Sequence, residues 1–204
     1  MNKFIIGLTG TYCSGKNYIA DILSDRGLNV LDVDKLGHIV IDNEKTALLK
    51  LFGDGILDQD GVIDRKLLGE KVFGKPQMLA ALEEIVHPRT TYMVNEWIAG
   101  QRDHPCVINA ALIHRSSVFN ELKAIILVHS PVIIRLLRAK KRDKLPWKEL
   151  FKRINSQKKY YSQYFTGKAD IYRVENWFFT GTFLYKRKKL EGRIDEILSL
   201  MGVR

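Results

Sequence analysis

Eight residues near the amino end of the chain have the types and spacing needed to bind a phosphate group. Residues 10–17 read GTYCSGKN and fit the pattern G-x-x-x-x-G-K-[ST] at every position except the last. Glycines let the backbone wrap around a phosphate with its amides pointing inward, and the lysine reaches the terminal phosphates of a nucleotide. The pattern predicts a nucleotide-binding loop, against the alternative of a fortuitous glycine-rich turn.

Two positions in this loop raise further questions. Asn17 stands where Ser or Thr normally offers a hydroxyl to Mg²⁺. Its amide oxygen is also a hard, neutral ligand, so Asn17 either coordinates the metal, directly or through water, or weakens metal binding. The Cys13 thiol precedes a helix N-terminus, where thiolates are favoured, so its oxidation could block the site. The alternative is that position 13 is simply variable.

The elements around the loop have the spacing of a strand–loop–helix–strand unit. Residues 3–8 are a short apolar run that predicts a buried strand, and residues 16–26 have the periodicity of a helix. Gly27 stands at the expected helix end, and residues 29–33 predict a second strand that leads to Asp34. A parallel pair joined by a helix is therefore expected.

The rest of the chain divides into a helical insertion and a return to the sheet. Residues 35–104 predict an all-helical insertion, with helices at 45–52, 65–73, 76–86 and 88–101. Strands are expected at 105–112, 124–128 and 171–174, and helices at 130–142, 148–165 and 182–201, the first of these capped by Ser130 with Pro131 in its first turn. The expected nucleotide-binding core comprises residues 1–34 and 105–204.

Composition sets broad limits on function. The 204 residues include 46% hydrophobic side chains and a formal charge of +10, and residues 135–159 carry eleven Lys/Arg against two acids. Such a positive field favours nucleotide phosphates, nucleic acid or an anionic membrane. No secretory signal and no apolar run long enough to span a membrane is found, so we expect a cytoplasmic protein without a membrane partner. Cys13 and Cys106 are expected to be free thiols.

The order of motifs along the chain resembles the dephospho-CoA kinase family. The run GLTGTYCSGKNYIADILSDRGLNVLDVDKLGHIV is similar to the family's amino end, and the likeness continues through FGDGILDQDGVIDRKLLGEKVF. Further matches are His87-Pro88, Arg142-Asp143, Arg153 with Gln157, and Ala169-Asp170 with Asn176. Together they cover most of residues 5–176, in order, and are more specific than the loop alone.

The resemblance implies an α/β P-loop kinase fold with a five-stranded parallel sheet flanked by helices. It also implies a helical substrate-binding lobe at 35–104 and a mobile helical lid at about 139–160. The implied reaction transfers the γ-phosphoryl group of ATP, with Mg²⁺, to the 3′-hydroxyl of dephospho-CoA in the last step of coenzyme A biosynthesis. A monomer or weak homo-oligomer is expected.

The resemblance also assigns roles to residues. Lys16, Asp34 and Arg142 are expected to be catalytic, with Asp34 as the base for the 3′-hydroxyl and Arg142 as a lid arginine on the phosphates. The expected ATP-binding residues are Gly10, Cys13, Ser14, Gly15, Lys16, Asn17, Tyr18, Arg142 and Asn176. The expected substrate-binding residues are Asp32, Asp34, Arg65 and His87, and the expected metal ligands are Asn17 and Asp32.

Several of these residues have structural alternatives. Asp34 could only cap the next helix, and His87 before Pro88 could be a helix-junction residue. Arg153 and Gln157 either reach the nucleotide together or form an isolated surface pair. Neighbouring basic residues, Arg138 among them with Lys141 and Lys144, are interpreted as a solvated face.

Three departures from the family pattern keep other functions open. Besides Asn17, residues 110–114 (AALIH) replace the family's PLLxE, and an acid usual after the fourth strand is replaced near Val128-His129. The alternatives are another small-molecule or nucleotide kinase, or a catalytically weakened nucleotide- or RNA-binding protein. The latter would use the basic segment and nearby aromatic residues, Tyr160, Tyr161, Tyr164 and Phe165. Nucleic acid is the less favoured partner.

Overall fold

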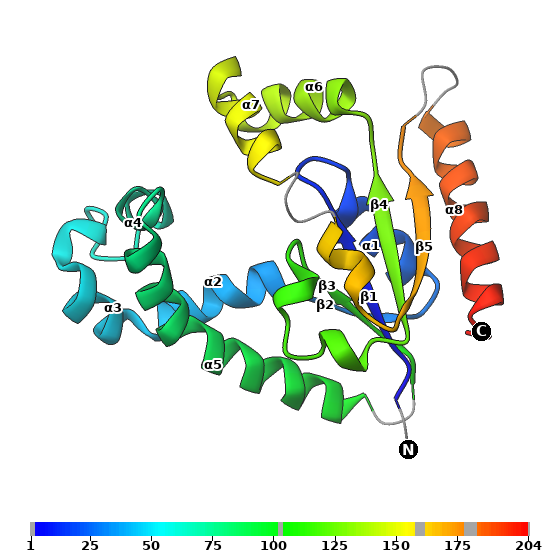
Figure 1. Cartoon of the computed structure of the whole chain (residues 1–204), viewed down its shortest axis with the longest axis horizontal. Coiled ribbons are helices and arrows are strands. Elements are labelled where there is room, and N and C mark those ends of the chain that lie inside the picture. Colours follow the sequence, from blue (N-terminus) through cyan, green and yellow to red (C-terminus); the bar gives the residue numbers. More distant parts are fainter. Residues whose placement is uncertain (1–2, 102–103, 158–161, 178–182, 204) are drawn as a thin grey trace. The chain divides into compact units, whose positions relative to one another are not determined.

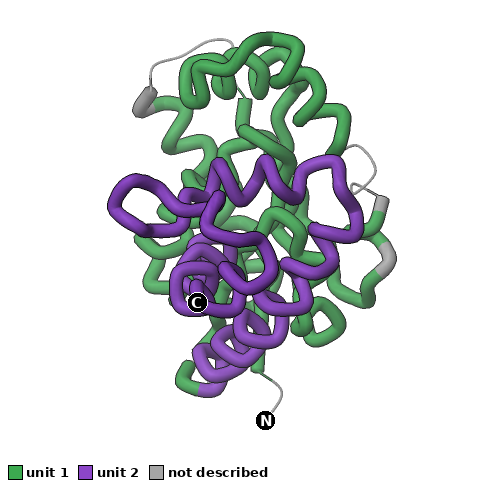
Figure 2. The backbone as a smooth tube through the Cα atoms, turned by 90° about the vertical axis from the view of Figure 1, so that its left-hand side faces the viewer, with its two compact units in different colours: residues 1–31, 100–204 green, residues 32–99 purple. Residues whose placement is uncertain are grey.

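A computed structural model describes residues 3–101, 104–157, 162–177 and 183–203. The chain forms two compact units (Figure 2): unit 1 comprises Met1–Leu31 and Gly100–Arg204, and unit 2 comprises Asp32–Ala99. Unit 2 corresponds to the helical insertion, for which the sequence predicts the bounds 35–104. Among the described residues, no helix is both long enough and apolar enough to cross a membrane.

Five parallel strands form the sheet (Figure 1), as predicted. Their order is β2-β3-β1-β4-β5, with bounds β1 Ile5–Gly10, β2 Asn29–Asp32, β3 Cys106–Asn109, β4 Ala124–His129 and β5 Asp170–Glu175. All six residues of β1 and all four of β3 are buried, as expected for strands covered on both faces. Leu8 pairs with Asn109, and Gly10 pairs with Val128. The carboxyl ends of β1, β3 and β4 therefore meet at one edge.

Helices cover this sheet in unit 1 and enclose an apolar core. They are α1 Lys16–Asp25, α6 Val132–Asp143, α7 Trp147–Ser156 and α8 Phe183–Leu200, with short 3₁₀ turns at η2 Ile113–Arg115, η3 Phe119–Glu121 and η5 Ser162–Thr166. Helix α8 packs beside β5 and α1 (Figure 1). The core joins Ile19, Ile22 and Leu23 of α1 to Ile194 and Ile197 of α8. The i, i+3, i+4 spacing thus places one face of α1 inward.

The predicted start of α6 is wrong by one residue, because the helix begins at Val132 and not at Pro131. Pro131, with φ −54° and ψ 147°, is extended and occupies the N-cap position, and no side chain caps the helix. Ser130 is buried, and its hydroxyl accepts a hydrogen bond from Nη1 of Arg138 at 3.4 Å. The serine therefore hydrogen-bonds to a side chain of α6 instead of capping the N-terminus of the helix.

The helix predicted over 148–165 is also shorter, because α7 ends at Ser156 and a 3₁₀ turn occupies Ser162–Thr166. Residues 158–161, which include Tyr160 and Tyr161, lie outside the described residues. Thr182, the predicted start of the last helix, also lies outside them, and α8 begins at Phe183.

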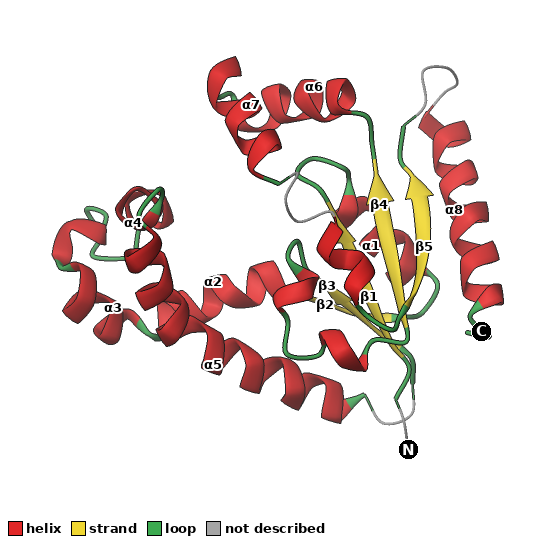
Figure 3. Cartoon of the chain, in the orientation of Figure 1, coloured by secondary structure: helices red, strands yellow, loops and turns green. Residues whose placement is uncertain are grey.

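Unit 2 consists of helices around a small core of its own (Figure 3). Its elements are α2 Val33–Asn43, α3 Lys45–Phe52, η1 Asp54–Ile56, α4 Arg65–Val72 and α5 Pro76–Gly100. Leu48, Ile56 and Leu68 are buried at the centre. A short antiparallel bridge between Leu57 and Ile63 closes the turn-rich segment before α4.

Helix α5 corrects the prediction of two helices separated at Pro88. The structure has one helix of 25 residues with Pro88 inside it. Proline lacks the N–H that would bond to the carbonyl of Glu84, but both residues are exposed, so water can solvate that carbonyl. The Thr90 hydroxyl donates to the Val86 carbonyl at 2.8 Å and supports the same turn.

Candidate phosphate-binding and active site

The loop between β1 and α1 has the backbone expected of a phosphate cradle. The amide of Ser14 donates to the carbonyl of Thr11 at 2.9 Å, which closes a turn. Cys13 and Gly15 both have positive φ, at 58° and 91°, and Gly15 is the N-cap of α1. Successive residues of this kind turn backbone amides toward one side, where the N-terminus of α1 also favours negative charge.

Close packing explains why the two pattern glycines are needed here. A Cβ at Gly10 would lie 2.5 Å from the Ser14 hydroxyl oxygen and 2.7 Å from the Val128 carbonyl oxygen. A Cβ at Gly15 would lie 2.1 Å from Nδ2 of Asn176. All three distances are below any normal contact, so only glycine fits without displacing backbone or buried side chains.

Two residues that follow the loop by more than 120 positions, Arg138 and Asn176, form hydrogen bonds to it. Asn176, just after β5, is buried, and its Nδ2 donates to the Ser14 carbonyl at 2.8 Å. Arg138 of α6 donates through Nη1 to the Ser14 carbonyl at 3.1 Å and through Nη2 to the Asn176 carbonyl at 2.9 Å. The interpretation of Arg138 as a solvated residue is therefore wrong. A hydrophobic stripe around it, at Leu136 and Ala139, was the available signal.

Arg142 lies beside the loop, in a different environment. Its guanidinium stacks over the ring of Tyr12 at 5.2 Å and bonds to Asp143 through Nε at 2.7 Å. The Tyr12 hydroxyl also donates to Asp143. The hydrogen bond from Arg142 is the largest contribution that lowers the pKa of Asp143, and the same bond raises the pKa of Arg142. The arginine is thus fully charged next to the loop.

Arg153 of α7 and Gln157, the residue that follows this helix, both approach this cluster. Nη1 of Arg153 lies 3.8 Å from Oδ2 of Asp143, and the side-chain carbonyl of Gln157 accepts the backbone amide of Tyr12. The two side chains are therefore part of one contact between the loop and α7, and the alternative of an isolated surface pair is wrong.

Cys13 does not have the environment of an activated thiol. Burial raises the pKa of the Cys13 thiol, and this outweighs the lowering effect of the positive charge on Arg142. Its position before a helix favours a thiolate, but loss of hydration counts more. The hypothesis of a reactive thiolate is not supported.

Asn17 is exposed at the start of α1, and its amide oxygen accepts a hydrogen bond from Nδ2 of Asn109 at 3.3 Å. Asn109 ends β3, is buried, and its own Oδ1 has no hydrogen-bond partner among the described residues. Two amide oxygens thus lie near the loop, a donor set that fits a hard cation held mainly by phosphate and water. Asn109 was missed in the sequence, although a polar residue ending an apolar strand was a usable signal.

No group of three or more His, Cys, Asp or Glu side chains that could hold a metal is found among the described residues. Asp32, the other predicted ligand, lies in unit 2 and caps α2 by accepting the amide of Lys35 at 3.1 Å.

The two other departures from the family pattern have structural consequences. His129 at the end of β4 lies 2.8 Å from Glu175, its register partner on β5. A carboxylate is therefore present at this edge of the sheet, supplied by the neighbouring strand. Burial would raise the pKa of Glu175, but hydrogen bonds from His129 and Trp177 lower it. His114 packs edge-on against Tyr164, and burial lowers its pKa, so the ring is neutral near pH 7.

The predicted substrate residues lie in unit 2, and the structure contradicts the structural alternatives considered for Asp34 and His87. Asp34 is exposed in the first turn of α2, and the capping role considered for it belongs to Asp32. Arg65 is the exposed first residue of α4, where Asp64 is the cap. His87 is exposed within α5, so it is not a junction between helices.

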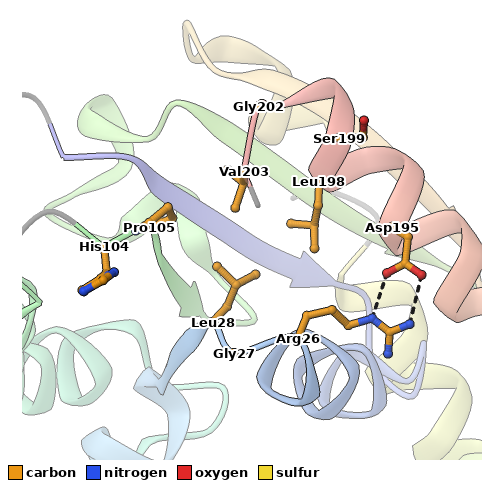
Figure 4. A pocket seen from close by; sticks show the side chains of 10 residues that line it. All are labelled: Arg26, Gly27, Leu28, His104, Pro105, Asp195, Leu198, Ser199, Gly202 and Val203. Atoms are coloured by element: carbon orange, nitrogen blue, oxygen red, sulfur yellow. Dashed lines mark hydrogen bonds and ion pairs between the residues drawn. The ribbon is translucent and has the colours of Figure 1, made fainter.

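A pocket of about 430 Å³ lies away from the loop, at the amino edge of the sheet in unit 1 (Figure 4). Its walls come from the segments that follow α1, precede β3 and end α8. Arg26 there forms a bidentate pair with Asp195, at 2.8 and 3.1 Å. None of the predicted site residues lines this pocket, and its one arginine is already neutralised.

The five-stranded parallel sheet and the glycine–lysine loop at its carboxyl edge define a P-loop nucleotide-binding protein of the kinase class. The sequence model of dephospho-CoA kinase matches residues 4–169. The chain belongs to the dephospho-CoA kinase family, whose members are transferases that use ATP.

Individual relatives agree with this assignment. A dephospho-CoA kinase of Treponema denticola is 33% identical over 198 residues, covering 92% of this chain and 87% of that protein. A crystal structure of a Thermus thermophilus protein superposes with a TM-score of 0.74 at 27% identity, covering 96% of this chain and 98% of that one. The dephospho-CoA kinase of Campylobacter jejuni gives 0.62 at 25% identity, covering 97% and 98%.

Proposed function

We propose that this chain transfers the γ-phosphoryl group of ATP to the 3′-hydroxyl of dephospho-CoA, forming coenzyme A and ADP. The observation that carries the proposal is the loop at residues 10–17, which has the backbone of a phosphate cradle in a chain of this family. Phosphoryl transfer depends mostly on positioning and on neutralising charge, and a loop of this kind supplies both.

Positive groups near the loop would hold the transferring phosphate. The loop amides and Lys16 bind its oxygens, while Arg138 and Asn176 keep the Ser14 carbonyl, and hence the loop, in place. Arg142 is exposed beside Tyr12 and adds a further charge as negative charge shifts to the departing ADP. Tyr18, in the first turn of α1, is a further proposed nucleotide contact.

The acceptor side of the reaction is assigned to unit 2. Asp34 is the proposed base that takes the proton of the 3′-hydroxyl, because it matches the family position and is exposed. Asp32, Arg65 and His87 are proposed contacts to the substrate. These four assignments rest on the resemblance of the motifs.

Mg²⁺ is the proposed metal, bound with the nucleotide and coordinated mainly by phosphate oxygens and water. When bound, it neutralises phosphate charge. Asn17 would contribute its amide oxygen, held in orientation by Asn109.

Incubation with ATP, Mg²⁺ and dephospho-CoA, followed by chromatographic separation of the products, tests the proposal. We expect coenzyme A to form, and Lys16→Met and Asp34→Asn each to lower kcat by about 10²–10⁴-fold. Lys141→Met, on the exposed face of α6, is the control and should keep full activity. The proposal is wrong if the wild type binds ATP and makes no coenzyme A. Full turnover by Asp34→Asn would remove only the assignment of the base.

A further inference from the structure

A pocket of about 330 Å³ adjoins the phosphate loop within unit 1. Thr11 of the loop forms one wall, His129 and Ser130 at the end of β4 form another, and Gln157 closes it from α7. Arg135, in the first turn of α6, also lines the pocket. The described lining residues include no carboxylate.

Arg135 has an unusual environment for an arginine. Only 6% of the residue is exposed, and its Nε is buried without a hydrogen-bond partner among the residues that the structure describes. Arg138, one turn further along the same helix, instead donates to carbonyl oxygens of the loop. Burial lowers the pKa of Arg135, and Cys13, which acts in the opposite direction, is no permanent negative charge.

An uncompensated buried guanidinium costs several kcal/mol, which a protein rarely tolerates without a partner. Two other arginines of this chain have carboxylate partners. Arg26 is paired with Asp195, and Arg142 with Asp143. At Arg135 the open space beside the guanidinium is the pocket itself, so an anion bound there would supply the missing negative charge.

We propose that Arg135 binds a phosphate oxygen of a phosphoanhydride group inside this pocket, and so acts as a substrate-binding residue beside the loop. The inference rests on the proposed function. It extends that function because the phosphate contacts proposed above, residues 10–17 and Arg142, do not include Arg135. Both proposed substrates contain a phosphoanhydride group, because ATP carries a triphosphate and dephospho-CoA carries a diphosphate. Thr11, which is part of both the loop and the pocket wall, brings the two sites together.

Calorimetry on the full chain, with four ligands, tests the proposal. Wild type and Arg135→Met are titrated with ATP, tripolyphosphate, dephospho-CoA and pyrophosphate. Loss of one charge-assisted interaction of about 1.5–3 kcal/mol corresponds to about a 10- to 100-fold weaker affinity. A loss confined to ATP and tripolyphosphate assigns the site to the nucleotide. A loss confined to dephospho-CoA and pyrophosphate assigns it to the acceptor.

Methionine is chosen because it fills a similar volume without the buried charge. Replacing a buried charge by an apolar side chain is often neutral or stabilising. The ligand-free Arg135→Met protein should therefore melt at the same temperature as the wild type or higher, which an arginine with a purely structural role would not allow. Lys141→Met, which removes the same charge from the exposed face of α6, should leave all four affinities unchanged.

Arg135→Lys provides a second variant if the methionine variant does not fold. It keeps the charge but loses the geometry of the guanidinium, so its affinity for the assigned ligands should fall about 3- to 10-fold. Affinities within twofold of wild type for all four ligands, in either folded variant, would overturn the proposal. Failure of the wild type to make coenzyme A while Arg135→Met loses phosphate affinity would instead contradict the proposed function alone.

Discussion

At Gly15 the loop backbone passes so close to Asn176 that even one methyl group cannot be accommodated. The same residue has a φ of 91°, which side chains other than glycine rarely adopt. Two independent constraints therefore act at one position. The steric constraint comes from Asn176, a residue 161 positions away in the sequence.

A substitution of Gly15 by Ala should lower ATP affinity at least tenfold, because the displaced Asn176 no longer holds the Ser14 carbonyl. The strained backbone and the contact together should also cost about 1–3 kcal/mol of stability. Gly27→Ala is the matched control, since its φ is 82° but nothing lies within 4 Å of an added Cβ. It should lose stability by about 1–2 kcal/mol and keep its ATP affinity. Calorimetric titration and thermal unfolding measure the two effects, and equal ATP affinities in both variants would contradict the steric argument.

Cys13 offers a second test at this scale. Since burial raises the pKa of its thiol, iodoacetamide should modify it slowly at pH 7.5, with a pH midpoint above the ordinary value of about 8.5. The measurement uses a Cys106→Ala background and mass spectrometry of the modified peptide. A midpoint below about 7.5 would restore the hypothesis of an activated thiolate.

The α6–α7 hairpin has its own small core and a charged contact with the loop. Leu136 and Ala139 of α6 pack against Leu150 and Ile154 of α7. Asp143, at the end of α6, is the centre of the charged contact, because Arg142, Arg153 and the Tyr12 hydroxyl all approach its carboxylate. This carboxylate is therefore one of several links between the hairpin and the loop, beside Arg138 and Gln157.

This attachment should depend on pH. The pKa of Asp143 is lowered in the folded state, chiefly by the hydrogen bond from Arg142. A charged Asp143 therefore stabilises the fold at every pH above its ordinary value of about 3.9, and the effect is lost as the pH falls through the lowered folded-state value. Asp143→Asn should be less stable than wild type at pH 7, and the difference should shrink below about pH 4.

Urea unfolding from pH 3 to 7 measures this difference. Glu70→Gln, an exposed substitution on α4, serves as the control and should show a much smaller gap from wild type at neutral pH. If the difference in free energy of unfolding between wild type and Asp143→Asn stays constant down to about pH 3, the charge on Asp143 is not the cause of the stability difference.

Over the whole molecule, the formal charge of +10 overstates the basic surface. Among the described basic residues of segment 135–159, Arg135 is buried, and Arg138 and Lys140 are half-buried. The charges of Arg142 and Arg153 are directed to Asp143. Tyr164, one of the aromatic residues considered for RNA stacking, is buried and donates its hydroxyl to the Ala111 carbonyl.

Binding to RNA should accordingly be weak and electrostatic. A fluorescent single-stranded RNA should bind measurably at about 50 mM salt and lose its affinity by about 200 mM. The slope of log affinity against log salt concentration should reflect the number of exposed basic residues that contact phosphates. Fluorescence anisotropy across this range checks the prediction. Tight RNA binding at 200 mM salt, unaffected by Lys16→Met, would favour the RNA-binding alternative.

The sequence by itself determined the loop, the strands around it, the helical insertion and the family. These features depend on local properties, namely glycine torsions, the period of apolar residues and the order of short motifs. The five-stranded sheet agrees with that prediction.

The tertiary structure decided which charged residues face the loop. Arg138, Arg135 and Arg142 lie within eight residues on one helix, and the apolar stripe at Leu136 and Ala139 does not indicate which of them contact the loop. Arg138 binds the Ser14 carbonyl across 124 positions of sequence, and Arg142 binds its own neighbour. The same holds for Asn109, which meets Asn17 across 92 positions. Hydrogen bonds between distant segments depend on how the strands are ordered and how the helices pack, and a periodic pattern within one helix contains neither.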